Sequence, residues 1–226
     1  MLEVILDTET TGLSADDGDR VIEIGCLKFE NHVLKDTYHT YINPERAISS
    51  GATAVHNLTE KKLKGEPVFA EIADDFLRFI EGASLVIHNA PFDLSMLNAE
   101  LVRLSRPTLT NPVIDTLVLA RRKFPGAPAS LDALCDRFGI SRQSREEGHG
   151  ALVDVHLLHH VYIQLIGGAQ NHLNLSVDEP QVADTLPTRR ERPIRLIQPN
   201  EKEQAAHRAL LDTMDDPLWD RLKKPA

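Results

Sequence analysis

Cysteine, aromatic residues and long hydrophobic runs are all scarce in this sequence of 226 residues. Its two cysteines, Cys26 and Cys135, lie far apart among apolar residues, so we expect buried, reduced thiols rather than a disulfide or a cysteine metal site. No stretch approaches the roughly 18 uninterrupted apolar residues of a membrane span. The N-terminus lacks the basic start and apolar core of a secretory signal. These absences favour a cytoplasmic protein without a membrane partner.

Positive charge is also in deficit, with 25 Lys and Arg residues against 34 Asp and Glu residues and a net charge of −9. This balance excludes proteins that coat nucleic acid through bulk basicity. It leaves room for an enzyme that binds a few nucleotides at a metal-loaded site, because divalent ions reverse the local sign of the charge. Apolar residues make up 42% of the chain, which is enough to build the core of one or two domains without disulfides.

Short apolar runs alternate with stretches of helical periodicity over residues 1–168. The apolar runs predict strands, at residues 2–6, 21–30, 33–43, 85–87 and 113–115. The periodic stretches predict helices, at residues 67–80, 93–104, 116–124, 131–138 and 151–166. Strands that first follow one another and then alternate with helices predict an α/β fold, with a mixed sheet flanked by helices.

The composition changes after Gly168. Residues 169–193 contain three prolines among polar and charged residues and show no periodicity, which predicts a flexible linker. Asn200 and Glu203 have the spacing of a capping box, so a helix is predicted from there to about Met214. The chain is therefore divided into three segments: a domain at 1–168, a linker at 169–198 and a helical tail at 199–226.

Two carboxylates end the first predicted strand, in the segment Asp7-Thr8-Glu9. Side chains two residues apart on a strand point to the same face, so Asp7 and Glu9 should project together from the edge of the sheet. Two like charges so close together repel, and a bound cation is the simplest compensation. Oxygen ligands favour magnesium or manganese. The alternative for such a pair alone is a helix cap beside a solvated acid.

Two later segments add acidic residues near element junctions. His88–Asp93 follows a predicted strand, although Asp93 alone would be explained as a helix N-cap. His149–Asp154 places a histidine and an acid at the start of a predicted helix. These two would lie about 140° apart on a regular helix, so they converge only if His149 lies on the turn before it, which Gly150 permits. A histidine on a loop suits a proton carrier.

The motifs D-T-E-T-T-G at residues 7–12, H-N-A-P-F-D at 88–93 and H-x4-D at 149–154 resemble, in order and spacing, the three motifs of the DEDDh 3′–5′ exonucleases. The resemblance covers residues 2–168 and, within that family, is closest to the proofreading epsilon subunits of bacterial DNA polymerase III. It implies a ribonuclease-H-like fold, with a five-stranded mixed sheet flanked by helices. It also implies a proofreading exonuclease that removes mispaired 3′-terminal nucleotides from DNA.

The resemblance assigns roles to five residues of these motifs. Two divalent cations, Mg²⁺ or Mn²⁺, would be held by four carboxylates: Asp7, Glu9, Asp93 and Asp154. His149 would act as the general base on a water that attacks the last phosphodiester, releasing a 5′-mononucleotide. The residues agree with this chemistry, because hydrolysis of an anionic phosphodiester requires charge neutralisation. The sequence shows no signal for a serine or cysteine nucleophile.

The same resemblance implies contacts to the terminal nucleotide. The implied nucleotide-binding set is Asp7, Glu9, Leu13, His56 and Asp154. Leu13 would lie beside the base, with an ordinary core leucine as the alternative. His56 would contact the nucleotide, with a loop histidine as the alternative. Three histidines of the last domain helix, His156, His159 and His160, are interpreted as packing or surface residues, with zinc binding as the other possibility.

The tail carries two candidate tethers. Gln170, Leu173 and Leu175 resemble the short peptide by which bacterial proteins bind the sliding clamp (beta), although Leu175 stands where an aromatic residue is common. The predicted tail helix, with Leu218 and Trp219 beyond it, resembles the epsilon segment that docks on the polymerase III alpha subunit. The alternative is a helix that folds back onto the front domain. The implied partners are therefore a single-stranded 3′ end of DNA at a primer terminus, the alpha subunit and the clamp.

Two competing functions are weighed against proofreading. A stand-alone DEDDh exonuclease that trims RNA or oligonucleotides would share the motifs but would need neither linker nor docking helix. A structural adaptor with a silent nuclease site is disfavoured because all five motif residues are present.

Overall fold

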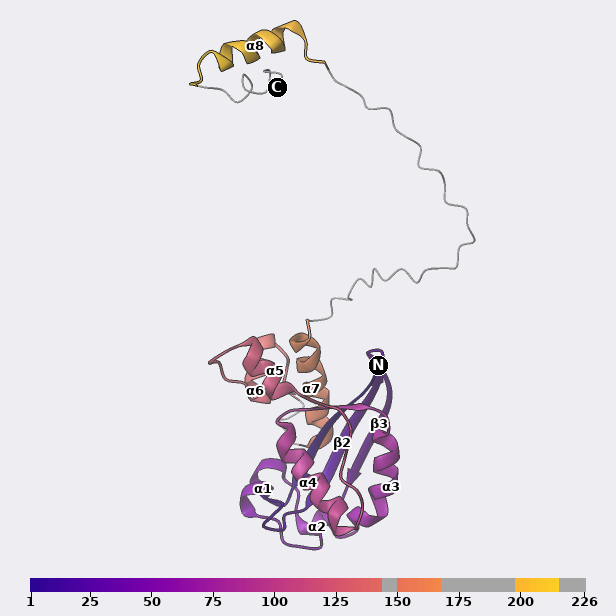
Figure 1. Cartoon of the computed structure of the whole chain (residues 1–226). Coiled ribbons are helices and arrows are strands. Elements are labelled where there is room, and N and C mark those ends of the chain that lie inside the picture. The colour runs from indigo at the N-terminus through magenta and orange to yellow at the C-terminus, as the bar shows by residue number, and fades with distance from the viewer. Residues whose placement is uncertain (144–149, 168–197, 216–226) are drawn as a thin grey trace, which may run out of the picture. The chain divides into compact units, whose positions relative to one another are not determined.

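The computed structural model describes residues 1–143, 150–167 and 198–215. The chain divides into two units, residues 1–173 and 174–226, and each is described by itself. The first unit is built on one five-stranded sheet with helices on both faces (Figure 1). Its strands lie in the order β3-β2-β1-β4-β5, with the bounds β1 Leu2–Thr10, β2 Val21–Glu30, β3 Val33–Tyr41, β4 Ser84–Ile87 and β5 Val113–Asp115.

The sheet is mixed, as the sequence predicts. Strands β1, β2 and β3 pair antiparallel, whereas β4 pairs parallel with both β1 and β5. Asn31 and His32 join β2 to β3 with φ of 51° and 65°, the left-handed pair that a tight hairpin requires. Because β1 and β4 are parallel neighbours, their carboxyl ends meet at one edge of the sheet, where Asp7 and Ile87 lie.

Helices cover both faces of the sheet. Their bounds are α1 Ser50–His56, α2 Glu60–Leu63, α3 Phe69–Ile80, α4 Ala90–Arg103, α5 Thr116–Lys123, α6 Leu131–Phe138 and α7 Ala151–Leu165. Helices α3 and α4 pack on the face that carries Leu6 and Ile24. Helices α5, α6 and α7 pack on the opposite face, which carries Ile5 and Leu27. The alternation of side chains along the strands thus places residues in two cores on opposite faces of the sheet, and a third, smaller cluster forms around Ile22, Ile48, Leu58 and Leu63.

The structure differs from the predicted elements mainly near the carboxyl edge of the sheet. Strand β1 continues to Thr10, well beyond the predicted end, because β2 pairs with it along its whole length. Helix α4 begins at Ala90, and Pro91 fits its first turn because that turn needs no backbone donor there. Helices α1 and α2 were not predicted. They begin after Ser49 and Thr59, whose hydroxyls cap them.

The two cysteines lie in different layers of the domain. Cys26 packs in the core beneath α3 and α4, and Cys135 packs in the core beneath α5 to α7. Both thiols are free and buried, as expected, and the sheet separates them. Burial raises the pKa of the Cys26 thiol far above its usual value, so it stays protonated.

Helix α8, at Glu201–Leu211, is the described element of the second unit. Asn200 Oδ1 accepts from the Glu203 N–H at 2.9 Å, and Glu203 Oε2 accepts from the Asn200 N–H at 2.8 Å. This is the predicted capping box, although the helix ends before Met214. Within the part of the chain that the structure describes, no helix has the length and apolar content needed to cross a membrane.

The ring of His159 on α7 stacks on Phe29 of β2, with centroids 4.2 Å apart. Burial, followed by the nearby His160, His156 and His32, lowers the pKa of His159 to about 4. The unfolded chain therefore binds more protons than the folded chain between about pH 6.5 and pH 4, so stability should fall as the pH drops through that window.

We expect acidification from pH 7 to pH 5 to cost about 1 kcal/mol through this half-buried histidine. The substitution His159→Phe keeps a stacked ring but removes the titrating group, so it should flatten that part of the stability profile. Urea unfolding at pH 7 and pH 5 measures both. An unchanged pH dependence in the variant would show that other groups control acid stability.

Candidate active site

Three carboxylates meet where β1 ends. Asp7 and Glu9 point to the same face of β1, and Asp154 reaches them from the first turn of α7. One oxygen from each carboxylate lies within 4.8 Å of the others. Asp154 is buried, while Asp7 and Glu9 are partly exposed. Three negative charges this close are unfavourable without a cation, and their oxygen donors fit a hard divalent ion such as Mg²⁺ or Mn²⁺.

A glycine in the neighbouring strand lets α7 reach this cluster. Gly25 pairs with Asp7 across the β1–β2 ladder. A Cβ atom on Gly25 would lie 2.5 Å from the Ala151 carbonyl carbon and 2.7 Å from the Leu152 nitrogen. No side chain fits in that space. The first turn of α7 therefore rests directly on the strand backbone, which brings Asp154 to the cluster.

Asp93, the fourth predicted ligand, lies on α4 beside β1 and is almost fully buried. Its Oδ1 accepts hydrogen bonds from the Thr8 N–H at 3.1 Å and the Thr8 hydroxyl at 2.7 Å. Thr8 points to the face opposite Asp7 and Glu9, and Asp93 is not among the three carboxylates whose oxygens lie within 4.8 Å of one another. Burial raises the pKa of Asp93 to about 7, against the hydrogen bonds from Thr8, which lower it. A nearby cation would favour the ionised form.

His149, the predicted general base, lies outside the described residues. The structure does describe Gly150, which is extended at φ −156° and ψ 138° and forms the N-cap of α7. The helix therefore begins at Ala151, after the histidine in sequence. The predicted start of this helix at residue 151 is confirmed.

A cavity of about 400 Å³ adjoins the acidic cluster through Glu9. Leu13, Val55 and Phe92 supply apolar side chains to its walls, and His56 supplies a polar one. Leu13 is 87% exposed, so the alternative that it belongs to the core is wrong. His56 is 4% exposed and ends α1, so it is no loop residue either.

The ring of His56 is oriented by the backbone. Its Nδ1 accepts a hydrogen bond from the Leu58 N–H at 3.0 Å, so the neutral ring carries its proton on Nε2. That buried Nε2 makes no hydrogen bond of standard geometry among the described residues, although the Thr10 backbone lies close enough to act on the ring. Burial lowers the pKa of His56, which favours the neutral ring. A donor of this kind beside an apolar cavity suits a ligand oxygen.

Sequence reasoning missed Glu23, a buried carboxylate beside the site. It pairs with Glu9 across β1 and β2, and its Oε1 lies 2.8 Å from His39 Nε2. Its Oε2 has no partner among the described residues, and Gly150 lies against it. A carboxylate at the start of α7 interacts favourably with the helix dipole. The available sequence signal was a glutamate and a glycine within the apolar first part of this strand, residues 21–27.

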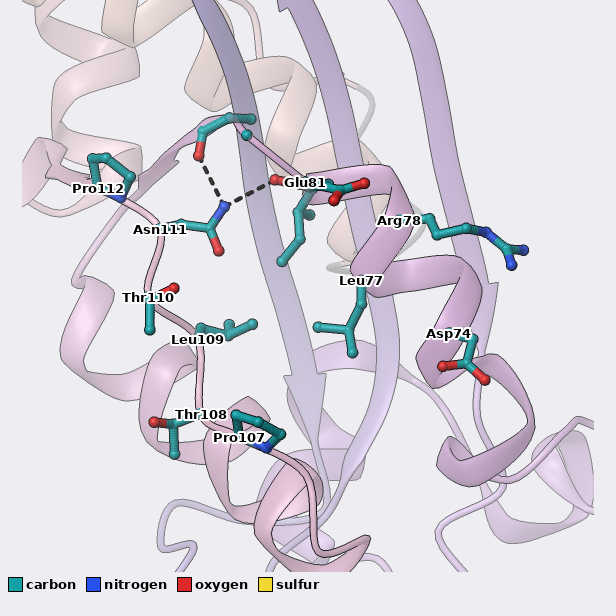
Figure 2. Close-up of a pocket in the computed structure, with 13 residues that line it drawn as sticks. Asp74, Leu77, Arg78, Glu81, Pro107, Thr108, Leu109, Thr110, Asn111 and Pro112 are labelled. Atoms are coloured by element: carbon teal, nitrogen blue, oxygen red, sulfur yellow. Dashed lines mark hydrogen bonds between the residues drawn. The ribbon is translucent and has the colours of Figure 1, made fainter.

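A second cavity, of about 690 Å³, is a separate feature (Figure 2). It lies between the end of α3 and residues 107–112, where Asn111 Nδ2 donates to the carbonyls of Ile80 and Ala83 at 2.9 Å each. Ala83 precedes β4, whereas the acidic cluster follows the carboxyl ends of the strands. This cavity is therefore not part of the candidate active site.

Comparisons with known proteins agree with this geometry. The sequence profile of the family described as Exonuclease matches residues 4–162. The chain is 44% identical over 222 residues to DNA polymerase III subunit epsilon of Rickettsia typhi, covering 93% of this chain and 95% of that protein. It is 38% identical over 224 residues to the subunit epsilon of Salmonella typhimurium, covering 93% and 92%.

Solved structures resemble the first unit. Exonuclease X in complex with 5′ overhanging duplex DNA superposes with a TM-score of 0.57 at 27% identity, covering 73% of this chain and 90% of that chain. The nuclease domain of 3′hExo, a DEDDh family member bound to rAMP, superposes with a TM-score of 0.61 at 16% identity, covering 73% and 91%. The second likeness supports the fold alone.

Proposed function

This chain belongs to the exonuclease family and, within it, to the epsilon subunits of bacterial DNA polymerase III, and we propose that its acidic cluster removes mispaired 3′-terminal nucleotides from DNA as 5′-mononucleotides. The ribonuclease-H-like fold and the 3′–5′ exonuclease activity follow from that membership. The observation that carries the proposal is the convergence of three carboxylate oxygens within 4.8 Å beside a nucleotide-sized cavity.

The donor set fits the divalent ions that the family uses. We assign two Mg²⁺ or Mn²⁺ ions to Asp7, Glu9 and Asp154, with Asp93 as the fourth carboxylate. When bound, such ions neutralise phosphate charge and make a water more acidic. His149, which precedes α7 in the sequence, is assigned as the general base that would take the proton of the attacking water.

The cavity beside Glu9 would hold the terminal nucleotide. Its walls, Leu13 and Val55 among them, are apolar and therefore contact a base of any identity without reading its edge. His56 lines the same cavity, and we assign it a contact with the terminal nucleotide. This arrangement suits an exonuclease that must remove any of the four nucleotides.

Residues 169–226 carry the proposed tethers to the replicase. A chain of net charge −9 should bind DNA weakly by itself, so tethering to the polymerase alpha subunit in the bacterial cytoplasm raises its effective concentration at the primer end. Leu210 is 55% exposed on α8, and no residue of that helix is buried, which supports a docking role. Leu218, Trp219 and the clamp peptide at Gln170, Leu173 and Leu175 lie outside the described residues.

Digestion of a 5′-labelled, 3′-mispaired primer–template with Mg²⁺ tests the proposal. The full chain and a fragment of residues 1–168 should both shorten the primer one nucleotide at a time. We expect only the full chain to be stimulated by the alpha subunit, because the fragment lacks α8. A full chain that ignores the polymerase and prefers RNA would support the stand-alone trimming enzyme instead.

A further inference from the structure

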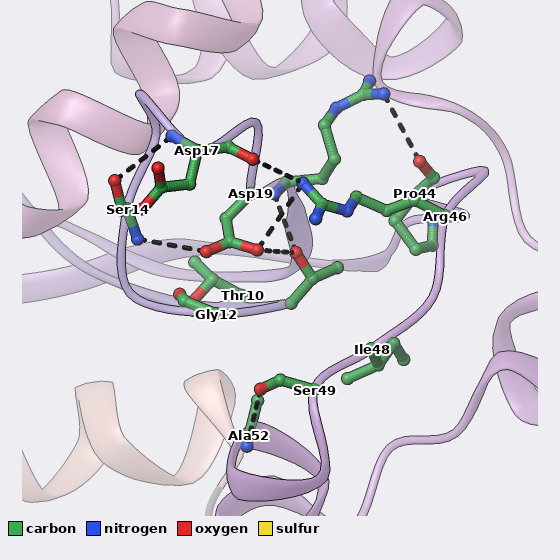
Figure 3. Close-up of polar contacts among 12 residues, drawn as sticks. Thr10, Gly12, Ser14, Asp17, Asp19, Pro44, Arg46, Ile48, Ser49 and Ala52 are labelled. Atoms are coloured by element: carbon green, nitrogen blue, oxygen red, sulfur yellow. Dashed lines mark hydrogen bonds and ion pairs between the residues drawn. The ribbon is translucent and has the colours of Figure 1, made fainter.

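The loop between β1 and β2 closes around the carboxylate of Asp19, whose side chain is 14% exposed (Figure 3). Asp19 Oδ1 accepts from the Thr11 hydroxyl at 2.8 Å, and Oδ2 accepts from the Ser14 N–H at 3.1 Å. Arg46 Nη1 lies 3.6 Å from Oδ1. Backbone hydrogen bonds between Asp19 and Ser14 and between Thr11 and Arg20 complete the loop. One carboxylate therefore holds both ends of this segment.

Gly12 lies directly on that carboxylate. A Cβ atom at Gly12 would lie 2.3 Å from Asp19 Oδ2 and 2.6 Å from Oδ1. The Thr10 hydroxyl also donates to the Gly12 carbonyl at 2.6 Å. The Asp19 carboxylate and the Thr10 hydroxyl therefore fix the position of Gly12. Leu13, the next residue, lines the cavity with its exposed side chain.

The same network reaches the opposite wall of the cavity. The Thr11 carbonyl accepts from the Ser49 N–H at 3.0 Å, and Ser49 caps α1. Arg46, on the segment that leads to Ser49, contacts Asp19 and donates to the Asp17 carbonyl at 3.4 Å. Helix α1 carries Val55 and His56, which line the cavity. The contacts of Asp19 with Thr11 and Arg46 therefore connect the loop that carries Leu13 to the segment that leads into α1.

We propose that Asp19 is a positioning residue for the terminal nucleotide: its carboxylate fixes the separation between the Leu13 wall and the α1 wall of the cavity. This inference rests on the proposed exonuclease function. Asp19 itself touches no metal-binding carboxylate in any described hydrogen bond or ion pair, so its loss should loosen nucleotide binding more than it slows the chemical step.

The test compares Asp19→Asn with Asp17→Asn. Both remove one negative charge from the same loop, but the Asp17 carboxylate makes no hydrogen bond or ion pair with the described residues. An asparagine at position 19 cannot accept from both Thr11 and Ser14 and attracts Arg46 less. We expect Asp19→Asn to raise KM for a single-stranded oligonucleotide about tenfold with kcat changed much less, and Asp17→Asn to match the wild type.

Two further measurements distinguish positioning from general stability. Binding of the product thymidine 5′-monophosphate with Mg²⁺, followed by calorimetry, should weaken in Asp19→Asn by a similar factor. A double-mutant cycle tests the contact between Gly12 and Asp19. As a single substitution, Gly12→Ala should raise KM, because the alanine Cβ displaces the Asp19 carboxylate. In the Asp19→Ala background, where that carboxylate is already gone, Gly12→Ala should raise KM little further.

The outcomes separate this inference from the proposed function. An active enzyme in which Asp19→Asn and Asp17→Asn behave alike would overturn the role of Asp19. So would additive effects of Gly12→Ala and Asp19→Ala, or a loss of kcat and melting temperature with KM and nucleotide binding unchanged. A wild-type chain without activity on any oligonucleotide would instead overturn the proposed function, while the nucleotide-binding comparison would still decide the role of Asp19.

Discussion

Replacing Asp7 by asparagine is expected to reduce exonuclease activity by about a thousandfold or more, which corresponds to losing ~4 kcal/mol of transition-state stabilisation. Asp7 is one of the three clustered carboxylates, paired with Gly25 on β2 and within 4.8 Å of oxygens from Glu9 and Asp154. Asparagine has the same shape but lacks the charge that a divalent ion requires. The loss should therefore appear in kcat at saturating Mg²⁺.

The same substitution should leave the fold intact or slightly stabilise it. Asp7 is partly exposed, and removing one of three crowded negative charges relieves repulsion when no cation is bound. Thermal unfolding in EDTA measures this, and binding of the alpha subunit should survive because α8 is unchanged. Asp16→Asn, an exposed carboxylate, is the matched control. An Asp7→Asn enzyme with full activity would refute the metal assignment.

The fold could be predicted from the sequence because its signals are local. The apolar runs at Leu85–Ile87 and Val113–Asp115 and the cap at Asn200 each indicate an element within a few residues. The convergence of Asp7 and Glu9 also followed from the two-residue period of a strand. The motifs alone did not indicate the hydrogen bonds that Asp93 Oδ1 accepts from Thr8, and the role of Asp93 as a metal ligand stays a prediction.

The parts that could not be predicted depend on contacts between distant segments. Helices α1 and α2 lie between β3 and α3, where capping hydroxyls at Ser49 and Thr59 were the available local signal. The role of Asp19 depends on Gly12 and Arg46, which approach it only after the loop has closed. Composition cannot reveal such a network, because aspartate in a loop is most often a turn residue.

The position of Asp154 depends on the close contact between α7 and Gly25. We therefore expect Gly25→Ala to impair both stability and activity. A methyl group there would lie 2.5 Å from the Ala151 carbonyl carbon, so α7 must shift away from β2. Overpacking of this kind costs about 1–3 kcal/mol, and a backbone obstacle cannot turn aside as a side chain can. The shift would move Asp154 away from Asp7 and Glu9.

Gly65→Ala is the matched control, because no atom lies within 4 Å of a Cβ at that position. It should leave stability and activity nearly unchanged. Two measurements distinguish a displaced α7 from an unfolded chain: the circular dichroism spectrum and the effect of Mn²⁺ on the melting temperature. Gly25→Ala should keep the circular dichroism spectrum of the folded protein but lose most of the Mn²⁺-induced rise in melting temperature, because the third carboxylate no longer reaches the ion. If that rise were retained with Asp154 displaced, two carboxylates would suffice to hold the metal, and the close contact at Gly25 would serve packing alone.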